Sequence, residues 1–303
     1  MRLLYGVIRI LLVVLLVVSA IRVGMYAADY LQARRASKGL REAYHAEEAI
    51  PAGTPQEVFV PAETPVQTIA EDTPSAAPAS PAPEVLESIY YPDNPMAKVS
   101  SRFQKIRRQN KDIVGWLTID ELVDEAVVHR DNQYYLDHDY RGYRNVNGAI
   151  FLDEACDLNT RPYTLMLFGH NMKNGLMFGG LRNYENIGFY RRNPLITFDT
   201  AYENGRYVIF SVATVNLNPH SRNYVDFFGL TGQEVSRRRS AIRALKNCSL
   251  YTAAIDVEAE DQILLLITCV DDDNERRVIA ARRVRPDEDE EWIRRYVQEV
   301  RKK

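Results

Sequence analysis

Many short apolar and β-branched runs, separated by modest gaps, predict a mainly β fold with peripheral helices, as a barrel or a mixed antiparallel sheet. Alternation or continuous apolar character marks each run, and polar turns bound it. The expected strands are residues 113–119, 126–129, 148–152, 162–168, 195–198, 206–216, 251–258, 263–268 and 276–284.

Helical patterns lie between and after these strands. Residues 231–247 begin with a capping box, in which Thr231 caps the helix and Glu234 reaches back to it. Residues 287–303 have acids in the first turn, bases in the last and one apolar stripe, so this helix is expected to dock on the domain. Further helices are expected at 97–109 and within 175–190.

The first 31 residues predict a membrane anchor. The stretch 7–30 is long and apolar enough to cross a bilayer, which takes about 20 residues. A cleaved signal peptide is the alternative, because residues 18–20 (Val-Ser-Ala) have the small-residue character of a cleavage site. Both interpretations place the rest of the chain outside the cell, and the anchor interpretation predicts a single-pass protein of the cell membrane.

Residues 32–95 are predicted to be a helical stalk followed by a linker rich in Pro, Ala and Glu. Such a composition cannot bury a core and predicts an extended, semi-rigid spacer. The folded domain is expected over 96–303. Eight of the fourteen prolines lie within residues 51–85, at Pro51, Pro55, Pro61, Pro65, Pro74, Pro78, Pro81 and Pro83.

Composition argues against several classes of protein. The formal net charge of −3 gives no reason to expect a nucleic-acid partner. The three cysteines share no close spacing and form no C-x-x-C motif, so a structural zinc site is not expected. No motif implies a metal or another cofactor.

A candidate nucleophile, Cys269, ends the expected strand 263–268 and precedes an acidic turn. A thiol at the end of a strand has a rigid backbone and a reachable sulfur, and as a thiolate it is a strong nucleophile. The same position also suits a small buried apolar side chain. Cys156 and Cys248 have an equal claim, so position alone does not choose among the three cysteines.

Two other groups that acyl transfer requires stand at strand ends. His170 follows the strand 162–168, and Gly169 before it permits a tight backbone that can aim the imidazole into a cleft. Arg276 and Arg277 open the strand after Cys269, and alternation places them on opposite faces. Taken singly, each is equally consistent with a solvated residue at a strand end, but together they supply a thiol, an imidazole and a guanidinium.

The motifs that contain these residues resemble those of the sortase family. Residues 266–269 (Leu-Ile-Thr-Cys), a loop and residues 276–279 (Arg-Arg-Val-Ile) are similar to the sortase signature T-C…R-x-[VI]. Residues 169–178 (Gly-His-Asn-Met-Lys-Asn-Gly-Leu-Met-Phe) resemble the histidine segment of class B sortases in particular. The likeness covers nearly all of 97–285, and its further motifs are residues 112–117, 131–139 and 148–153.

The resemblance implies an eight-stranded barrel and a cysteine transpeptidase of Gram-positive cells. Cys269 would form a thioester with the sorting motif of a secreted surface protein, and His170 would act as general acid and then base. The family spacing selects Arg276 to stabilise the oxyanion, with Arg277 as the fallback. Thr268 and Asn171 would support the site or the substrate.

The resemblance also implies partners. The acyl group would pass to an amine of a peptidoglycan precursor or to a pilin lysine, and the helix 231–247 would shape the substrate groove. Two other interpretations remain open: a catalytically weak module that only binds a peptide on the same barrel, and a thiol protease that hydrolyses its thioester.

Overall fold

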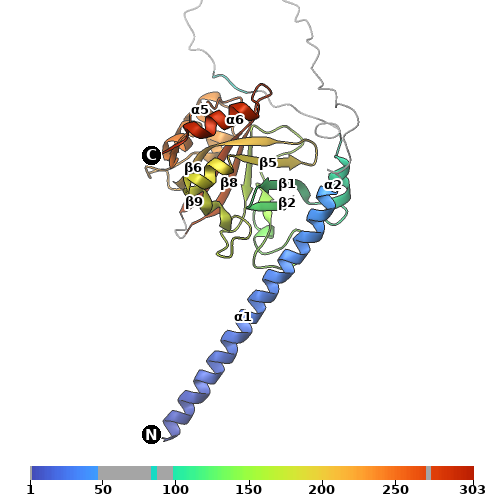
Figure 1. The fold of residues 1–303 in the computed structure, drawn as a ribbon, viewed down its shortest axis with the longest axis vertical. Helices are drawn as coiled ribbons and strands as arrows, with labels where there is room; N and C mark the ends of the chain where they lie inside the picture. The colour runs from blue at the N-terminus through green and yellow to red at the C-terminus, as the bar shows by residue number, and fades with distance from the viewer. Residues whose placement is uncertain (1, 47–82, 87–97, 271–273) are drawn as a thin grey trace, which may run out of the picture.

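The computed structural model describes residues 2–46, 83–86, 98–270 and 274–303. Within them, strands close into a barrel in the order β1-β2-β3-β4-β8-β9-β6-β5, which confirms the predicted eight-stranded fold (Figure 1). The barrel strands are β1 (Ile113–Ile119), β2 (Val123–His129), β3 (Ile150–Leu152), β4 (Thr164–Phe168), β5 (Leu195–Thr200), β6 (Arg206–Asn216), β8 (Ile263–Cys269) and β9 (Glu275–Arg283).

Strand β8 lies between β4 and β9. It runs parallel to β4 and antiparallel to β9. Its first six residues are all buried, as expected for a continuous apolar run covered on both faces. The exception is its last residue, Cys269, which is exposed. The strand therefore leaves the core at the cysteine.

The helices are shorter than predicted, and one predicted cap is wrong. Thr231 does not cap α5 (Val235–Cys248), because its hydroxyl donates to the carbonyl oxygen of Phe228 inside the preceding helix α4 (Phe227–Thr231). Glu234 stands at the N-cap of α5 without a capping hydrogen bond from its side chain. The remaining short helices are α2 (Ser101–Ile106), η1 (Tyr134–Leu136), η2 (Gly179–Glu185) and α3 (Ile187–Arg192).

The C-terminal segment differs from its prediction at both of its elements. The expected strand 251–258 is reduced to β7 (Tyr251–Thr252), which pairs with β10 (Arg301–Lys302) outside the barrel. Helix α6 (Glu290–Glu299) therefore ends before the chain does, and its N-cap Asp289 accepts a hydrogen bond from the amide of Trp292. The helix does dock, because Ile293, Tyr296 and Val297 are buried.

The N-terminal segment is a single helix, α1 (Arg2–His45), which projects from the barrel in Figure 1. Its window Ile8–Met25 has a mean hydropathy of 2.4 and is long and apolar enough to cross a membrane. The other end packs on the barrel, where the ring of Tyr44 stacks on Trp116 of β1 at 4.2 Å between centroids. Tyr44 Oη also donates to Asp199 of β5 at 2.7 Å. The predicted stalk is thus helical, and its end is part of the folded domain.

Most of the predicted linker lies outside the described residues, including its first seven prolines. The described piece, residues 83–86, contacts the segment before α5. Leu86 N donates to the carbonyl oxygen of Gln233, and Val235 N donates to that of Glu84. This part of the linker is therefore attached to the domain.

Candidate active site

The ends of β4, β8 and β9 bring the three candidate residues to one edge of the barrel. Phe168, the last residue of β4, pairs with Ile267 of β8. The two chains run parallel, so two residues further along each of them His170 lies level with Cys269. On the other side of β8, Cys269 pairs directly with Arg276 of β9. Neighbouring strands lie about 4.8 Å apart, so the three residues occupy adjacent positions.

The three cysteines have different surroundings. Cys156 is buried, its thiol lies 3.6 Å from the carbonyl oxygen of Thr164, and burial raises its pKa to about 12. Cys248 is half-buried, and burial raises its pKa as well. Cys269 alone among the three is exposed, and none of them forms a disulfide. A reactive thiol must be reachable and able to ionise. The structure therefore favours Cys269 as the candidate nucleophile, whereas position in the sequence did not distinguish the three cysteines.

His170 is half-buried beside this cysteine. Its Nε2 lies 2.6 Å from the carbonyl oxygen of Leu136. A carbonyl oxygen only accepts hydrogen bonds, so Nε2 is the nitrogen that carries hydrogen. The other ring nitrogen, Nδ1, therefore remains to exchange a proton with a reacting group.

The two consecutive arginines separate onto different faces of β9. Arg276 lies opposite the exposed Cys269 and donates from Nη1 to the carbonyl oxygen of Glu275 at 2.8 Å. Arg277 lies opposite the buried Thr268, and its Nη2 forms an ion pair with Glu185 of η2 at 2.5 Å. Directly opposed residues in an antiparallel pair point to the same face, so Arg276 shares the face of the thiol.

The two predicted supporting residues have structural roles. Thr268 Oγ1 donates to the carbonyl oxygen of Gly169 at 2.7 Å and so ties β8 to the residue before His170. Asn171 pairs with Met177 at the base of the loop that follows. A Cβ atom at Gly169 would lie 3.0 Å from the buried ring of Phe178, so close packing against that ring, and not a left-handed backbone, favours glycine there.

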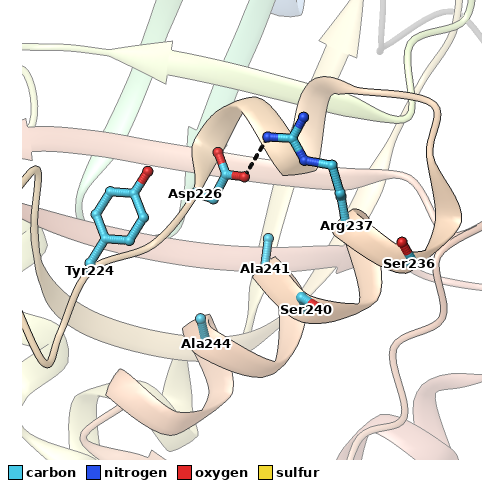
Figure 2. A pocket seen from close by; sticks show the side chains of 7 residues that line it. All are labelled: Tyr224, Asp226, Ser236, Arg237, Ser240, Ala241 and Ala244. Atoms are coloured by element: carbon cyan, nitrogen blue, oxygen red, sulfur yellow. Dashed lines mark hydrogen bonds and ion pairs between the residues drawn. The ribbon is translucent and has the colours of Figure 1, made fainter. Parts of the chain in front are cut away.

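A surface pocket of about 230 Å³ lies between α5 and the loop after β6. Figure 2 shows Asp226 and Arg237 paired across it, with a distance of 2.8 Å between Oδ2 and Nη2. Tyr224 on the wall of the pocket forms a backbone bridge with Asn216 of β6, and Asn216 pairs with Glu275, the residue before Arg276. Helices α4 and α5 thus occupy the place where the family resemblance expects a helix that shapes the groove.

No metal-binding cluster was expected from the motifs. In the part of the chain that the structure describes, no three His, Cys, Asp or Glu side chains gather so as to hold a metal ion.

The sequence analysis missed two partners of the site residues. The Leu136 carbonyl oxygen belongs to the motif 131–139, which carried the family likeness without a role for any residue in it. Glu185, the partner of Arg277, lies in a segment expected only to be helical. Neither partner leaves a local signal in the sequence, because a backbone carbonyl has no side-chain signature and an ion pair between distant segments depends on the fold.

Known proteins similar to this chain are sortases. The chain is 31% identical over 185 residues to Sortase B of Listeria monocytogenes, an alignment that covers 58% of this chain and 70% of that protein. It is 26% identical over 175 residues to Sortase B of Staphylococcus aureus, covering 57% and 69%. No family model matches the chain.

Solved structures agree in fold. Sortase B of Bacillus anthracis in complex with AAEK2 matches with a TM-score of 0.61 at 24% identity, over 84% of this chain and 97% of that one. A Staphylococcus aureus sortase B–substrate complex matches with a TM-score of 0.56 at 24% identity, over 63% and 88%. A sortase B complexed with triglycine matches with a TM-score of 0.55 at 26% identity, also over 63% and 88%.

The relative at 31% identity is covered over more than two thirds of its length, and solved sortase B structures share the fold of this chain. The chain therefore belongs to the class B sortases, a family of cysteine transpeptidases that anchor proteins to the cell wall.

Proposed function

We propose that Cys269 is the nucleophile of this transpeptidase, with His170 as its acid–base group and Arg276 as its oxyanion-stabilising cation. The observation that carries the proposal is the register of β8, which places the one exposed cysteine opposite Arg276 and level with His170. Thiol, imidazole and guanidinium at one barrel edge are the groups that acyl transfer from a peptide requires.

In the first half of the reaction, the thiolate of Cys269 attacks the carbonyl carbon of a scissile peptide bond in the sorting motif. The C–N bond breaks, the leaving amine takes a proton from His170, and a thioester remains on the sulfur. In the second half, an amine attacks the thioester and His170 accepts its proton. The sulfur then leaves as thiolate, so the enzyme returns to its starting state.

Arg276 acts on the charge that develops during both steps. The carbonyl oxygen becomes an oxyanion in each tetrahedral intermediate, and a guanidinium stays charged and offers several donors. Arg276 projects from the strand next to Cys269 on the same face, which suits this role. Arg277 is held by Glu185 on the other face and is the weaker candidate.

We infer the substrate class from the ligands with which the structural relatives were solved. One was solved with a substrate and another with triglycine, a peptide with a free amine. For this chain we propose a sorting-motif peptide of a secreted surface protein as acyl donor, and an amine of a peptidoglycan precursor or a pilin as acceptor. The pocket beside Tyr224 and α5 is a candidate subsite for a side chain of that peptide.

The proposed location is the outer face of the cell membrane. Helix α1 is apolar over Ile8–Met25 and, in the described residues, these side chains are not buried in the protein. A single crossing by α1 would leave the barrel outside, where surface proteins and wall precursors meet the enzyme.

The test is mass spectrometry of the full chain incubated with a small library of sorting peptides, with and without an added amine. We expect an acyl-enzyme adduct without amine and a peptide–amine product with it, and neither with Cys269→Ala. Hydrolysed peptide as the sole product, even with a saturating amine, would contradict transpeptidation. An adduct that survives in Cys269→Ala would contradict the choice of nucleophile.

A further inference from the structure

The ring of His170 is oriented by a backbone group from a distant part of the chain. The carbonyl oxygen of Leu136 lies 2.6 Å from Nε2 and accepts its hydrogen. This bond requires hydrogen on Nε2 and so leaves Nδ1 as the unprotonated nitrogen of a neutral ring. The position of one carbonyl oxygen thus sets the geometry of proton transfer.

The turn that carries this carbonyl is anchored at its start. The carboxylate of Asp131 accepts hydrogen bonds from Gln133 N at 3.0 Å and Tyr134 N at 2.7 Å. The buried side chain of Tyr135 donates from Oη to Asp112 at 2.9 Å. These contacts fix the beginning of η1, but they do not touch the Leu136 carbonyl group itself.

Gly148 fixes the carbonyl. Its φ of +60° is in the left-handed region, and a Cβ atom built there would lie 2.6 Å from Tyr135 O and 2.8 Å from Leu136 O. Both distances are shorter than any real Cβ contact, so a side chain at 148 has to displace these backbone oxygens. Ala149 N also donates to Tyr135 O at 3.0 Å, which holds the two segments together.

A second glycine in the same loop gives a natural comparison. Gly142 has a φ of +83°, so a side chain there meets a similar backbone strain. Its Cβ would approach only the hydroxyl of Tyr134, at 3.2 Å, which is the far end of a side chain. Substituting each glycine in turn therefore separates the effect of backbone strain in the loop from the effect of displacing the Leu136 carbonyl.

We propose that Gly148 is a positioning residue for catalysis: its missing side chain lets the Leu136 carbonyl reach His170 and hold the ring with hydrogen on Nε2 and with Nδ1 available for proton transfer. The proposal rests on the role proposed above for His170. It goes further by naming which nitrogen transfers the proton and which residues select it.

The first test reads the tautomer without turnover. The full chain, labelled with ¹⁵N-histidine and held in lipid nanodiscs, gives ring nitrogen shifts that distinguish the two neutral tautomers, and His170→Gln assigns the signal. We expect the Nε2–H tautomer. A neutral ring protonated on Nδ1 overturns the proposal even if His170 is catalytic, so this failure is distinct from a failure of the proposed function.

The second test compares Gly148→Ala with Gly142→Ala in acylation and transpeptidation. Because misplacing a catalytic group by about 1 Å can cost about 100-fold, we expect kcat of Gly148→Ala to fall by about that factor with KM changed less than about two-fold. Gly142→Ala should keep kcat within about three-fold. Gly148→Asn should behave like Gly148→Ala, since asparagine tolerates a positive φ but still carries a Cβ.

Equal losses in the two alanine variants would overturn the proposal, as would a Gly148→Ala enzyme with the wild-type kcat and tautomer. If the variants at 148 do not fold, a wild-type ring protonated on Nδ1 would still overturn the proposal.

Discussion

Strand β9 carries two arginines near each end, and Arg282 at one end and Arg276 at the other have different surroundings. Arg282 is fully buried, and its Nη1 and Nη2 lie 2.9 and 2.5 Å from the two carboxylate oxygens of Glu288. Arg276, at the other end, is half-buried and lies opposite an exposed thiol. A buried guanidinium paired with a carboxylate is committed to the fold, whereas one that faces a groove can act on a substrate.

The same contrast holds for the cysteines. Cys156 lies in the core, and burial raises the pKa of its thiol to about 12, so it stays protonated at neutral pH. Cys269 ends a strand whose other six residues are all buried, but it is itself exposed. Residue type alone therefore does not predict whether a side chain is reactive, because reactivity also depends on whether the structure buries it. The predictions below test this division between the site edge and the core.

Replacing the exposed thiol should have the largest effect. Cys269→Ala is expected to reduce acylation by at least about 10⁴-fold, because a nucleophile has no substitute in covalent catalysis. Rates measured with a fluorogenic sorting peptide check this, and thermal unfolding should show a melting temperature close to the wild type. A variant that retains a tenth of the activity would place the chemistry elsewhere.

Replacing the cation opposite the thiol should have the next largest effect. Arg276→Ala is expected to lower kcat by about 10²- to 10³-fold, the cost of losing one oxyanion donor. Arg277→Ala is the matched control: it breaks only the pair with a half-exposed Glu185, so kcat should change less than about three-fold. Steady-state kinetics of both variants decide, and the reverse order would exchange the roles of the two arginines.

At the core end of β9, we expect a substitution to change the stability of the fold and not the rate of acylation. Glu288→Ala leaves the buried Arg282 without its carboxylate and is expected to lower the free energy of unfolding by about 3–5 kcal/mol. Acylation per folded molecule should stay unchanged. Chemical denaturation measures the loss.

The control for that variant is Glu290→Ala, which removes the partner of Arg206 from an exposed ion pair. Such pairs contribute up to about 1 kcal/mol, so the unfolding free energy should barely move. If both variants lose the same stability, burial does not explain the cost of removing the partner of Arg282.

The smallest expected effect concerns the turn that carries the Leu136 carbonyl. The backbone amides of Tyr134 and Gln133 hold the pKa of Asp131 below its usual value. A carboxylate with a lowered folded-state pKa stabilises the fold above its unfolded pKa of about 3.9, and this stabilisation disappears as the pH falls through the folded pKa.

Asp131→Ala should therefore melt below the wild type at pH 7 and converge with it as the pH is lowered from about 4 to 2. Melting curves over this range test it, with Asp120→Ala at an exposed position as control for lost charge. A gap that stays constant down to pH 2 would rule out the ionised carboxylate as the cause.

Much of the barrel could be predicted, because local pattern and tertiary environment agree there. The apolar run of β8 is buried on both faces, and the 206–216 strand has the predicted bounds. Prediction failed where distant contacts decide. Residues 253–258 form no strand, since only Tyr251 and Thr252 find a partner, at the far end of the chain.

The candidate site could be predicted to about the same extent as the barrel. The sequence supplied the three side chains, and the choice of Arg276 rested on a family spacing that the register now supports with geometry. It could not supply the Leu136 carbonyl, whose contact with His170 depends on how closely the chain at Gly148 approaches. Nor could it predict that Tyr44 would stack on Trp116, because an aromatic residue in a polar helix does not reveal its partner.

The most direct test of the central claim is to label the wild-type protein with a sorting-peptide analogue that carries a thiol-reactive group, and to map the modified residue by mass spectrometry of its fragments. The account predicts one adduct, on Cys269, which forms more slowly when Arg276 is replaced by alanine. An adduct on Cys156 or Cys248, or a Cys269 that stays unmodified in the folded protein, would contradict it.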